Sequence, residues 1–245
     1  MKTDTMQADV IIIPETETVF PITERTQKKH FAQGLNFYKL FWLFMLGSFF
    51  GVVIETLYCL ITRHVYESRV GLIYGPFNPV YGGGMVVLTL LLDRIKQKRD
   101  LFVMACSMII GGAFEYLCSL FQEIFFGTVS WEYSHTQFNF AGRTNLMYCM
   151  FWGVLGTVFI KDVMPHLHRL IEKIPYVFGV ILTWILIVFI SSDIFLSVAA
   201  VKRVEERKQQ IIPSNSFEEF VDRHYDDAFM KEKYPNMMTV RQAQD

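Results

Sequence analysis

The sequence predicts an all-α membrane protein, a polytopic transmembrane helix bundle of about five spans. Of its 245 residues, 52% are hydrophobic and 16% are aromatic. The apolar residues fall in long blocks, and five blocks approach the roughly 20 residues that a helix needs to cross a bilayer core about 30 Å thick. The net charge is −1, with positive residues in short clusters between the blocks. This pattern excludes a nucleic-acid-binding surface and makes the lipid bilayer the expected partner.

The expected spans are residues 38–61, 79–92, 101–126, 146–160 and 176–200. The second and fourth are short, but each follows a loop rich in Gly, Pro, Asn or aromatic residues. We expect these loops to be partly buried and to complete the spans. Outside residues 38–200, we expect a polar N-terminal arm (1–37) and a soluble, solvated C-terminal tail (201–245). In the tail, Ser216 and Glu219 predict a capping box that opens a short helix.

The segment between spans four and five predicts a short helix on the membrane surface. Apolar residues recur at helical spacing over 164–174, and Pro165 stands near the start, where a helix tolerates proline. Positive residues close to span ends number about eleven on the N-terminal side and about seven on the other side. The positive-inside rule therefore predicts a multi-pass protein of the cell membrane with a cytoplasmic N-terminus, although the basic cluster after span five favours the opposite orientation.

Spans one and three end in a shared pattern, G-x-x-x-E-x-L-x-x-L, and N-x-x-Y opens the span after each. A duplicated two-span unit would produce this pattern, and so would two helix pairs that became similar independently. The residues concerned are Gly51 and Glu55, Gly111 and Glu115, Asn78 and Tyr81, and Asn145 and Tyr148.

Three acids are expected at a shared depth. Spans one, three and five run in the same direction, so Glu55, Glu115 and Asp193 lie in the same half of the bilayer. Each charge costs about 2.5 to 3.5 kcal/mol at the membrane centre and needs a partner. Arg143 lies on that side, and we expect it to balance them. The acids then serve either as structural partners of Arg143 or as contacts for a substrate, ion or proton.

Two loops supply the other candidate residues of this polar core. Prolines and glycines in the first loop cannot continue a helix, so backbone groups stay open near the membrane. The second loop mixes aromatic and hydrogen-bonding side chains, although Trp131 and Tyr133 also suit a plain interfacial aromatic belt. No catalytic residue, metal site or cofactor is indicated, and the four cysteines match no zinc or redox spacing. The candidates are Tyr74, Gly75, Pro76, Asn78, Pro79 and Tyr81 in the first loop, and Trp131, Glu132, Tyr133, Asn139 and Arg143 in the second.

The same loops carry a resemblance. G-x-x-Y-G-P-x-x-P-x-Y-G (71–82) and W-E-Y-S-x-x-x-F-N-x-x-G-R (131–143), each after a glutamate-bearing span, resemble a bacterial family catalogued as type IV ABC-transporter permeases. The resemblance covers roughly residues 38–200, and Val52 departs from it where a tryptophan is expected. It implies a transport component. Because the sequence has no Walker A motif, it also implies a separate ATPase subunit, and five spans are few enough to imply a homo-oligomer.

Three functions therefore remain open. The first is a permease-like transport component in which the acids line a cavity and Arg143 balances them. The second is a membrane scaffold or regulatory protein with a structural polar core. The third is a membrane-embedded enzyme acting on a lipid, in which a buried glutamate is the general base and Arg143 steadies the head group. A neighbouring ATPase gene would favour the first, and a neighbouring lipid-modifying pathway would favour the third. The sequence does not name a substrate.

Overall fold

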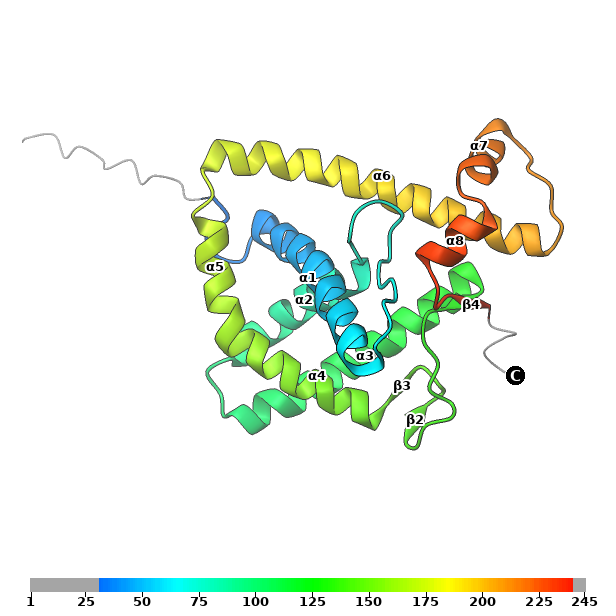
Figure 1. Cartoon of the computed structure of the whole chain (residues 1–245). Coiled ribbons are helices and arrows are strands. Elements are labelled where there is room, and N and C mark those ends of the chain that lie inside the picture. Colours follow the sequence, from blue (N-terminus) through cyan, green and yellow to red (C-terminus); the bar gives the residue numbers. More distant parts are fainter. Residues whose placement is uncertain (1–30, 240–245) are drawn as a thin grey trace, which may run out of the picture.

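A computed structural model describes residues 31–239, and the chain is an all-α bundle with two very small antiparallel sheets (Figure 1). Four helical stretches are long and apolar enough to cross a membrane, namely 37–63, 100–126, 146–172 and 176–208. The helices are α1 (Phe37–Arg63), α2 (Pro79–Leu92), a 3-10 turn (Asp93–Ile95), α3 (Asp100–Phe126), α4 (Leu146–Val158), a π turn (Phe159–Val163), α5 (Met164–Glu172), α6 (Tyr176–Lys208), α7 (Ser216–His224) and α8 (Asp227–Lys233). The strands are β1 (Thr128–Val129), β2 (Asn139–Phe140), β3 (Thr144–Asn145) and β4 (Met238–Thr239). The predicted polytopic all-α bundle is confirmed.

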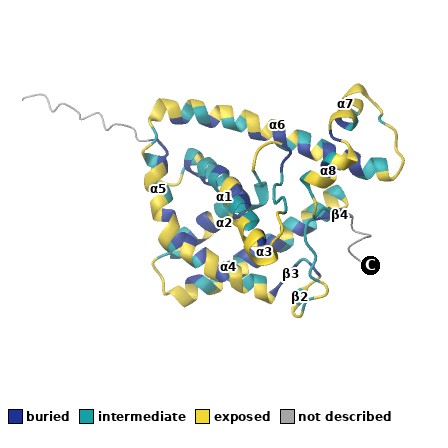
Figure 2. Ribbon diagram, in the orientation of Figure 1, coloured by how far each residue is buried: buried dark blue, intermediate teal, exposed yellow. Residues whose placement is uncertain are grey.

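Apolar side chains cover the outside of the bundle. Large hydrophobic residues stay exposed along α3, α4 and α6, for example Ile109, Leu155 and Ile185. Figure 2 shows exposed residues recurring along these helices between intermediate and buried ones. In water such an apolar covering would be an aggregation surface, whereas in a bilayer it contacts lipid tails. The chain is therefore a multi-pass membrane protein.

Helices α1 and α2 form one tight hairpin, and α3 and α4 form another. A Cβ added at Gly51 would lie 2.4 Å from the Cβ of Tyr81, and one added at Gly111 would lie 2.4 Å from the Cβ of Trp152. Small residues thus let the backbones approach closely, as is common between membrane helices. Asn78 caps α2 through Val80 N–H, and Asn145 caps α4 through Tyr148 N–H.

The first loop, residues 64–78, turns back into the bundle. Asn78 N–H donates to Ser48 O at 3.1 Å, and Ser48 lies about 22 Å below the end of α1 at 1.5 Å per residue. Helix α2 therefore begins in the interior, and its 14 residues, about 21 Å long, are fewer than those of the four helical stretches that could cross a membrane. The loop backbone is held by protein at this depth, which is the condition for irregular chain inside a membrane.

Helix α5 is not a separate surface helix, contrary to the sequence prediction. The π turn Phe159–Val163 joins it to α4, and Figure 1 shows the two as one bent helix. The helix tolerates Pro165 because the π turn just before it already interrupts the regular backbone hydrogen bonding. A fully buried Lys39 near the start of α1 forms an ion pair with Glu172 at the end of α5. This pair fixes the far end of the bent helix against α1.

The C-terminal tail is packed against the bundle, where the sequence predicts a solvated appendage. Helix α6 continues to Lys208, and α7 and α8 fold back on its last turns (Figure 1). Val221, Tyr225 and Met230 of the tail are buried in one cluster with Ile73 of the first loop and Ala200 of α6. The apolar face of α7 explains this docking, because a helix stabilised by one apolar stripe must bury it.

Charged contacts fix the same docking. Arg203 binds Asp222 at 2.6 Å, and Arg207 binds Asp227 at 2.6 Å. Hydrogen bonds from Arg203 outweigh the effect of burial and hold the pKa of Asp222 below its usual value. Strand β4 then pairs antiparallel with β1, with Thr128 opposite Thr239. The tail therefore joins α6 to both loops at one end of the bundle.

Two smaller expectations also change. Helix α7 begins at Ser216 as predicted, but its N-cap is Asn215, and the returning carboxylate is Glu218 rather than Glu219. Most of the predicted N-terminal arm lies outside the described residues. Within 31–37, Phe31 is buried against Gly179, so the core begins before the predicted boundary.

Candidate functional site

Glu55 of α1 is neutralised by an arginine from the first loop. Arg69 approaches the Glu55 carboxylate at 3.4 Å and binds Glu67 at 2.6 Å. It also donates to Cys59 Sγ at 3.1 Å, and Asn78 holds its backbone by donating from Nδ2 to Arg69 O. Burial is the largest single effect and lowers the pKa of Arg69, but Glu55, Cys59 and Glu67 together outweigh it and leave the pKa raised. Arg69 therefore stays charged and compensates the first acid.

Glu115 of α3 has no such cation. Its side chain is buried, with 9% of the residue exposed, and it accepts hydrogen bonds from Thr144 Oγ1 at 2.7 Å and from the Tyr133 hydroxyl at 3.1 Å. Among the described residues, no ion pair includes Glu115. Burial, and next the charge of Glu115, push the pKa of Tyr133 far above its usual value, so Tyr133 remains a donor.

The second loop is folded to bring these hydroxyls inward. Strands β2 and β3 pair antiparallel with Phe140 opposite Thr144, and Tyr133 N–H donates to Gly142 O at 2.8 Å. The Tyr133 ring also stacks on Tyr148 of α4, with centroids 4.7 Å apart. Glu115 lies about 16 Å below the end of α3, so this loop too reaches into the bundle.

The first two acids contact different loops. Glu115 accepts hydrogen bonds from Tyr133 and Thr144 of the second loop, whereas Glu55 contacts Arg69 of the first loop.

Arg143 does not balance the three acids, and that prediction is wrong. Its guanidinium binds Glu123 at 2.5 Å and lies over the Tyr116 ring at 5.6 Å. Glu123 lies two turns closer to the loop than Glu115, so it meets the arginine first. Trp131 supports this position by donating from Nε1 to Arg143 O at 2.9 Å. Trp131 is therefore more than a residue of an interfacial belt.

Glu132 and Asn139 build the second loop and do not join Glu115. Glu132 accepts from Ser134 N–H, and Asn139 accepts from Gly142 N–H at 3.1 Å. Burial is the largest single effect and raises the pKa of Glu132, but the Ser134 hydrogen bonds and His135 together outweigh it and leave the pKa of this carboxyl lowered. These contacts are local to the loop and hold its turns.

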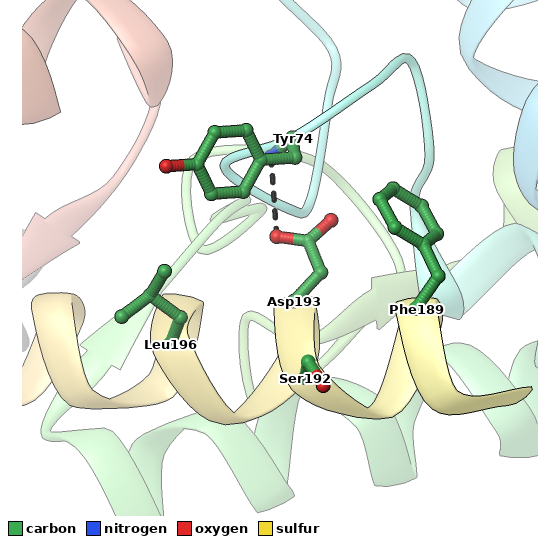
Figure 3. Close-up of a pocket in the computed structure, with 5 residues that line it drawn as sticks. All are labelled: Tyr74, Phe189, Ser192, Asp193 and Leu196. Carbon is green, nitrogen blue, oxygen red and sulfur yellow. Dashed lines mark hydrogen bonds between the residues drawn. The ribbon is translucent and has the colours of Figure 1, made fainter.

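Asp193 of α6 is held by the first loop at a separate place. Tyr74 N–H donates to Asp193 Oδ1 at 3.1 Å (Figure 3). Ser197 Oγ donates to the same oxygen at 3.3 Å. Gly75 makes this turn possible with φ at +70°, a backbone conformation that glycine adopts readily. Of the other candidates in this loop, Pro76 is exposed in the turn, Pro79 opens α2 and Tyr81 packs on Gly51.

Sequence reasoning did not single out Arg69, Thr144 or Glu123, and it named Tyr148 only as part of the N-x-x-Y pattern. The available signal was position, because Arg69 immediately precedes the Gly-Pro segment and Glu123 follows Glu115 at i+8 on one helix face. For Thr144 we find no sequence signal beyond its place just before the N-x-x-Y pattern. In the described part of the chain, no group of three or more His, Cys, Asp or Glu side chains is arranged to hold a metal ion.

Comparison with known proteins gives one family. The family described as "Putative ABC-transporter type IV" matches residues 42–198, which include both re-entrant loops and all three acids. No curated protein and no solved structure matches the chain. Because the match spans well over half of the chain, this protein belongs to the "Putative ABC-transporter type IV" family.

Proposed function

We propose that the chain is the permease-like membrane component of an ABC-type transport system, and that its transport step depends on Glu115. One observation carries the proposal: Glu115 is a buried acid in a membrane-spanning helix that has two hydroxyl donors and, among the described residues, no ion-pair partner. An intramembrane acid without a fixed cation is the group that can take up a proton or bind a passing cation.

The surroundings of Glu115 support this role. Tyr133 and Thr144 are neutral donors, so they hold either oxygen in place without cancelling its charge. Their hydroxyls can also accept a hydrogen bond, so they can stay bonded if the carboxyl becomes protonated. Glu55, by contrast, is already paired with Arg69. We therefore assign the change of charge to Glu115 and a structural role to Glu55.

Two alternative functions compare differently with the same contacts. An enzyme that used Arg143 to steady a lipid head group would need that guanidinium free, but it is bound to Glu123. A scaffold with a structural polar core is the second candidate, because the two bonds to Glu115 satisfy a purely structural acid equally well. Replacing Glu115 by glutamine separates the scaffold from the transport component, since only the latter needs the charge.

We further propose that α5 contacts a separate ATPase subunit on the cytoplasmic side. Helix α5 lies at the end of the bundle opposite the two loops, on the side predicted to be cytoplasmic. Its exposed residues Pro165, His166 and Arg169 form a surface next to the membrane, and Lys39 anchors the helix through Glu172. A helix fixed at both ends can pass movement of a bound ATPase to α1 and α4.

Affinity purification from native membranes tests this proposal. We expect the tagged chain to retain an ATP-hydrolysing polypeptide, and Arg169→Glu to lose it, because the variant reverses an exposed charge at the proposed contact. Arg223→Glu is the matched control: it is equally exposed but lies on α7 at the opposite end. Absence of ATPase from the wild-type preparation, or equal loss in both variants, would count against the transport assignment.

A further inference from the structure

Asp193 has an oxygen without a partner inside the bundle. The residue is 3% exposed, and both of its hydrogen bonds, from Tyr74 N–H and Ser197 Oγ, go to Oδ1. The buried Oδ2 has no hydrogen-bond partner among the described residues. Whether the carboxyl is ionised or protonated, this leaves one polar atom unsatisfied. Such an atom usually marks a missing ligand or water.

Asp193 also lines a cleft with aromatic walls. Tyr74, Phe189, Ser192, Asp193 and Leu196 line an open space of about 450 Å³. Figure 3 shows the second Asp193 oxygen pointing away from the Tyr74 backbone, toward the side where Phe189 stands. Contacts outside the cleft hold both rings. The Tyr74 and Tyr225 hydroxyls form a hydrogen bond of 2.8 Å, and the Phe77 and Phe189 rings pack with centroids 6.2 Å apart.

We propose that this cleft binds the ammonium group of an amphiphile. The cation would occupy the cleft beside the Asp193 carboxyl, between the rings of Tyr74 and Phe189, and its hydrocarbon chain would lie along Leu196. A carboxylate beside aromatic faces is the arrangement that attracts alkylammonium and quaternary ammonium groups. The exposed apolar face of α6 next to the cleft suits a chain that arrives from the lipid.

Other occupants agree less well with the cleft. A bare metal ion needs several oxygen or nitrogen ligands, and the described residues provide no such group here. Lys233 of α8 is close enough for its charge to act on Asp193, but the two form no ion pair in the described structure. The ammonium group can come from a lipid head group or from a free amphiphile, and the experiment distinguishes these sources. The inference does not depend on the function proposed for Glu115, which lies in another polar region.

Native mass spectrometry of the full chain in an uncharged detergent provides the test. The probes are dodecyltrimethylammonium, dioctanoyl phosphatidylcholine and an uncharged dodecyl ether. We expect one dodecyltrimethylammonium molecule per chain, bound more tightly than the ether. Asp193→Asn should weaken that binding about tenfold, which corresponds to roughly 1.4 kcal/mol. Equal binding of the phosphatidylcholine identifies a lipid head group as the source, and binding of the alkylammonium alone identifies a free amphiphile.

Two further variants keep the proposal falsifiable. Glu219→Gln removes an equally negative but exposed charge at the same end of the bundle, and its affinity should stay within about twofold of wild type, because exposed charges act weakly. Phe189→Leu keeps an apolar wall but removes the ring, so it should weaken ammonium binding about threefold and leave ether binding unchanged. It also decides the question if Asp193→Asn does not fold. Binding of the ammonium no tighter than the ether, or undiminished binding in Asp193→Asn and Phe189→Leu, would overturn the proposal.

Discussion

The hairpins α1/α2 and α3/α4 are built alike but treat their acids differently. In each, a glycine on the first helix lies against an aromatic residue of the second, and an asparagine caps the second helix at the end of a re-entrant loop. In the first hairpin the loop arginine reaches Glu55, whereas in the second it is bound by Glu123 before it can reach Glu115. The same frame therefore holds one compensated acid and one acid with hydroxyl donors only.

This difference separates stability from function. The ion pair of Glu55 and Arg69 holds the first loop in the bundle, so its loss should affect folding. A neutral side chain of the same shape could supply most of the stability that Glu115 provides. Loss of the Glu115 charge should therefore affect function. The shared architecture of the two hairpins alone would not reveal this difference, because it depends on which acid the loop arginine contacts.

The largest expected effect tests the likeness of the hairpins. Gly51→Ala and Gly111→Ala should each lower the free energy of unfolding by about 2 to 3 kcal/mol, because the new Cβ would stand 2.4 Å from a side chain of the facing helix. Gly83→Ala is the control. Its Cβ would lie 3.3 Å from the tip of the Phe114 ring, which can move. Thermal unfolding in detergent measures all three, and a large effect in only one hairpin would contradict the shared construction.

Arg69→Gln should have the next largest effect and lower the free energy of unfolding by about 2 kcal/mol. It strands Glu55 and Glu67, but Glu55 is 32% exposed, so the loss stays below the roughly 3 to 5 kcal/mol of a fully buried pair. Arg63→Gln is the matched control, because the Arg63 side chain is 61% exposed. This substitution should change the free energy of unfolding by less than about 0.5 kcal/mol. If the two variants unfold at the same temperature, Arg69 does not hold the first loop.

Arg143→Gln should cost about 1 kcal/mol, because Glu123 is partly exposed and water can replace part of the lost contact. A double-mutant cycle sharpens the comparison. The coupling energy between Arg143→Gln and Glu123→Gln should be about 1 kcal/mol, and that between Arg143→Gln and Glu115→Gln should be near zero. The reverse order would restore Arg143 as the partner of Glu115.

Glu115→Gln should have the smallest effect on stability, below about 1 kcal/mol. The amide can accept one hydroxyl hydrogen bond and donate the other, so Tyr133 and Thr144 remain partnered. Glu115→Leu should cost about 2 kcal/mol, because it leaves both buried hydroxyls without this partner. Equal melting temperatures for the two variants would show that the hydroxyls do not bond Glu115.

Much of the fold was predictable because long apolar blocks determine membrane helices. The bounds of α2, Pro79–Leu92, followed from the Gly-Pro loop before it. The ion-pair partners of the acids could not be predicted from the sequence, because Arg69 and Arg143 look equivalent there. Only the depth of each loop decides which acid its arginine reaches. The packed tail was missed because its mixed charges resemble a solvated segment, whereas Asp222 and Asp227 pair with arginines of α6.

Complementation in a strain that depends on this protein tests the central claim most directly. It compares Glu115→Gln with the double variant Glu55→Gln/Arg69→Gln, which removes the first acid and its cation together. At equal membrane levels, we predict that Glu115→Gln fails to restore growth and that the double variant restores it. Normal growth with Glu115→Gln would contradict the account, because the uncompensated acid would then carry no function that its charge supplies.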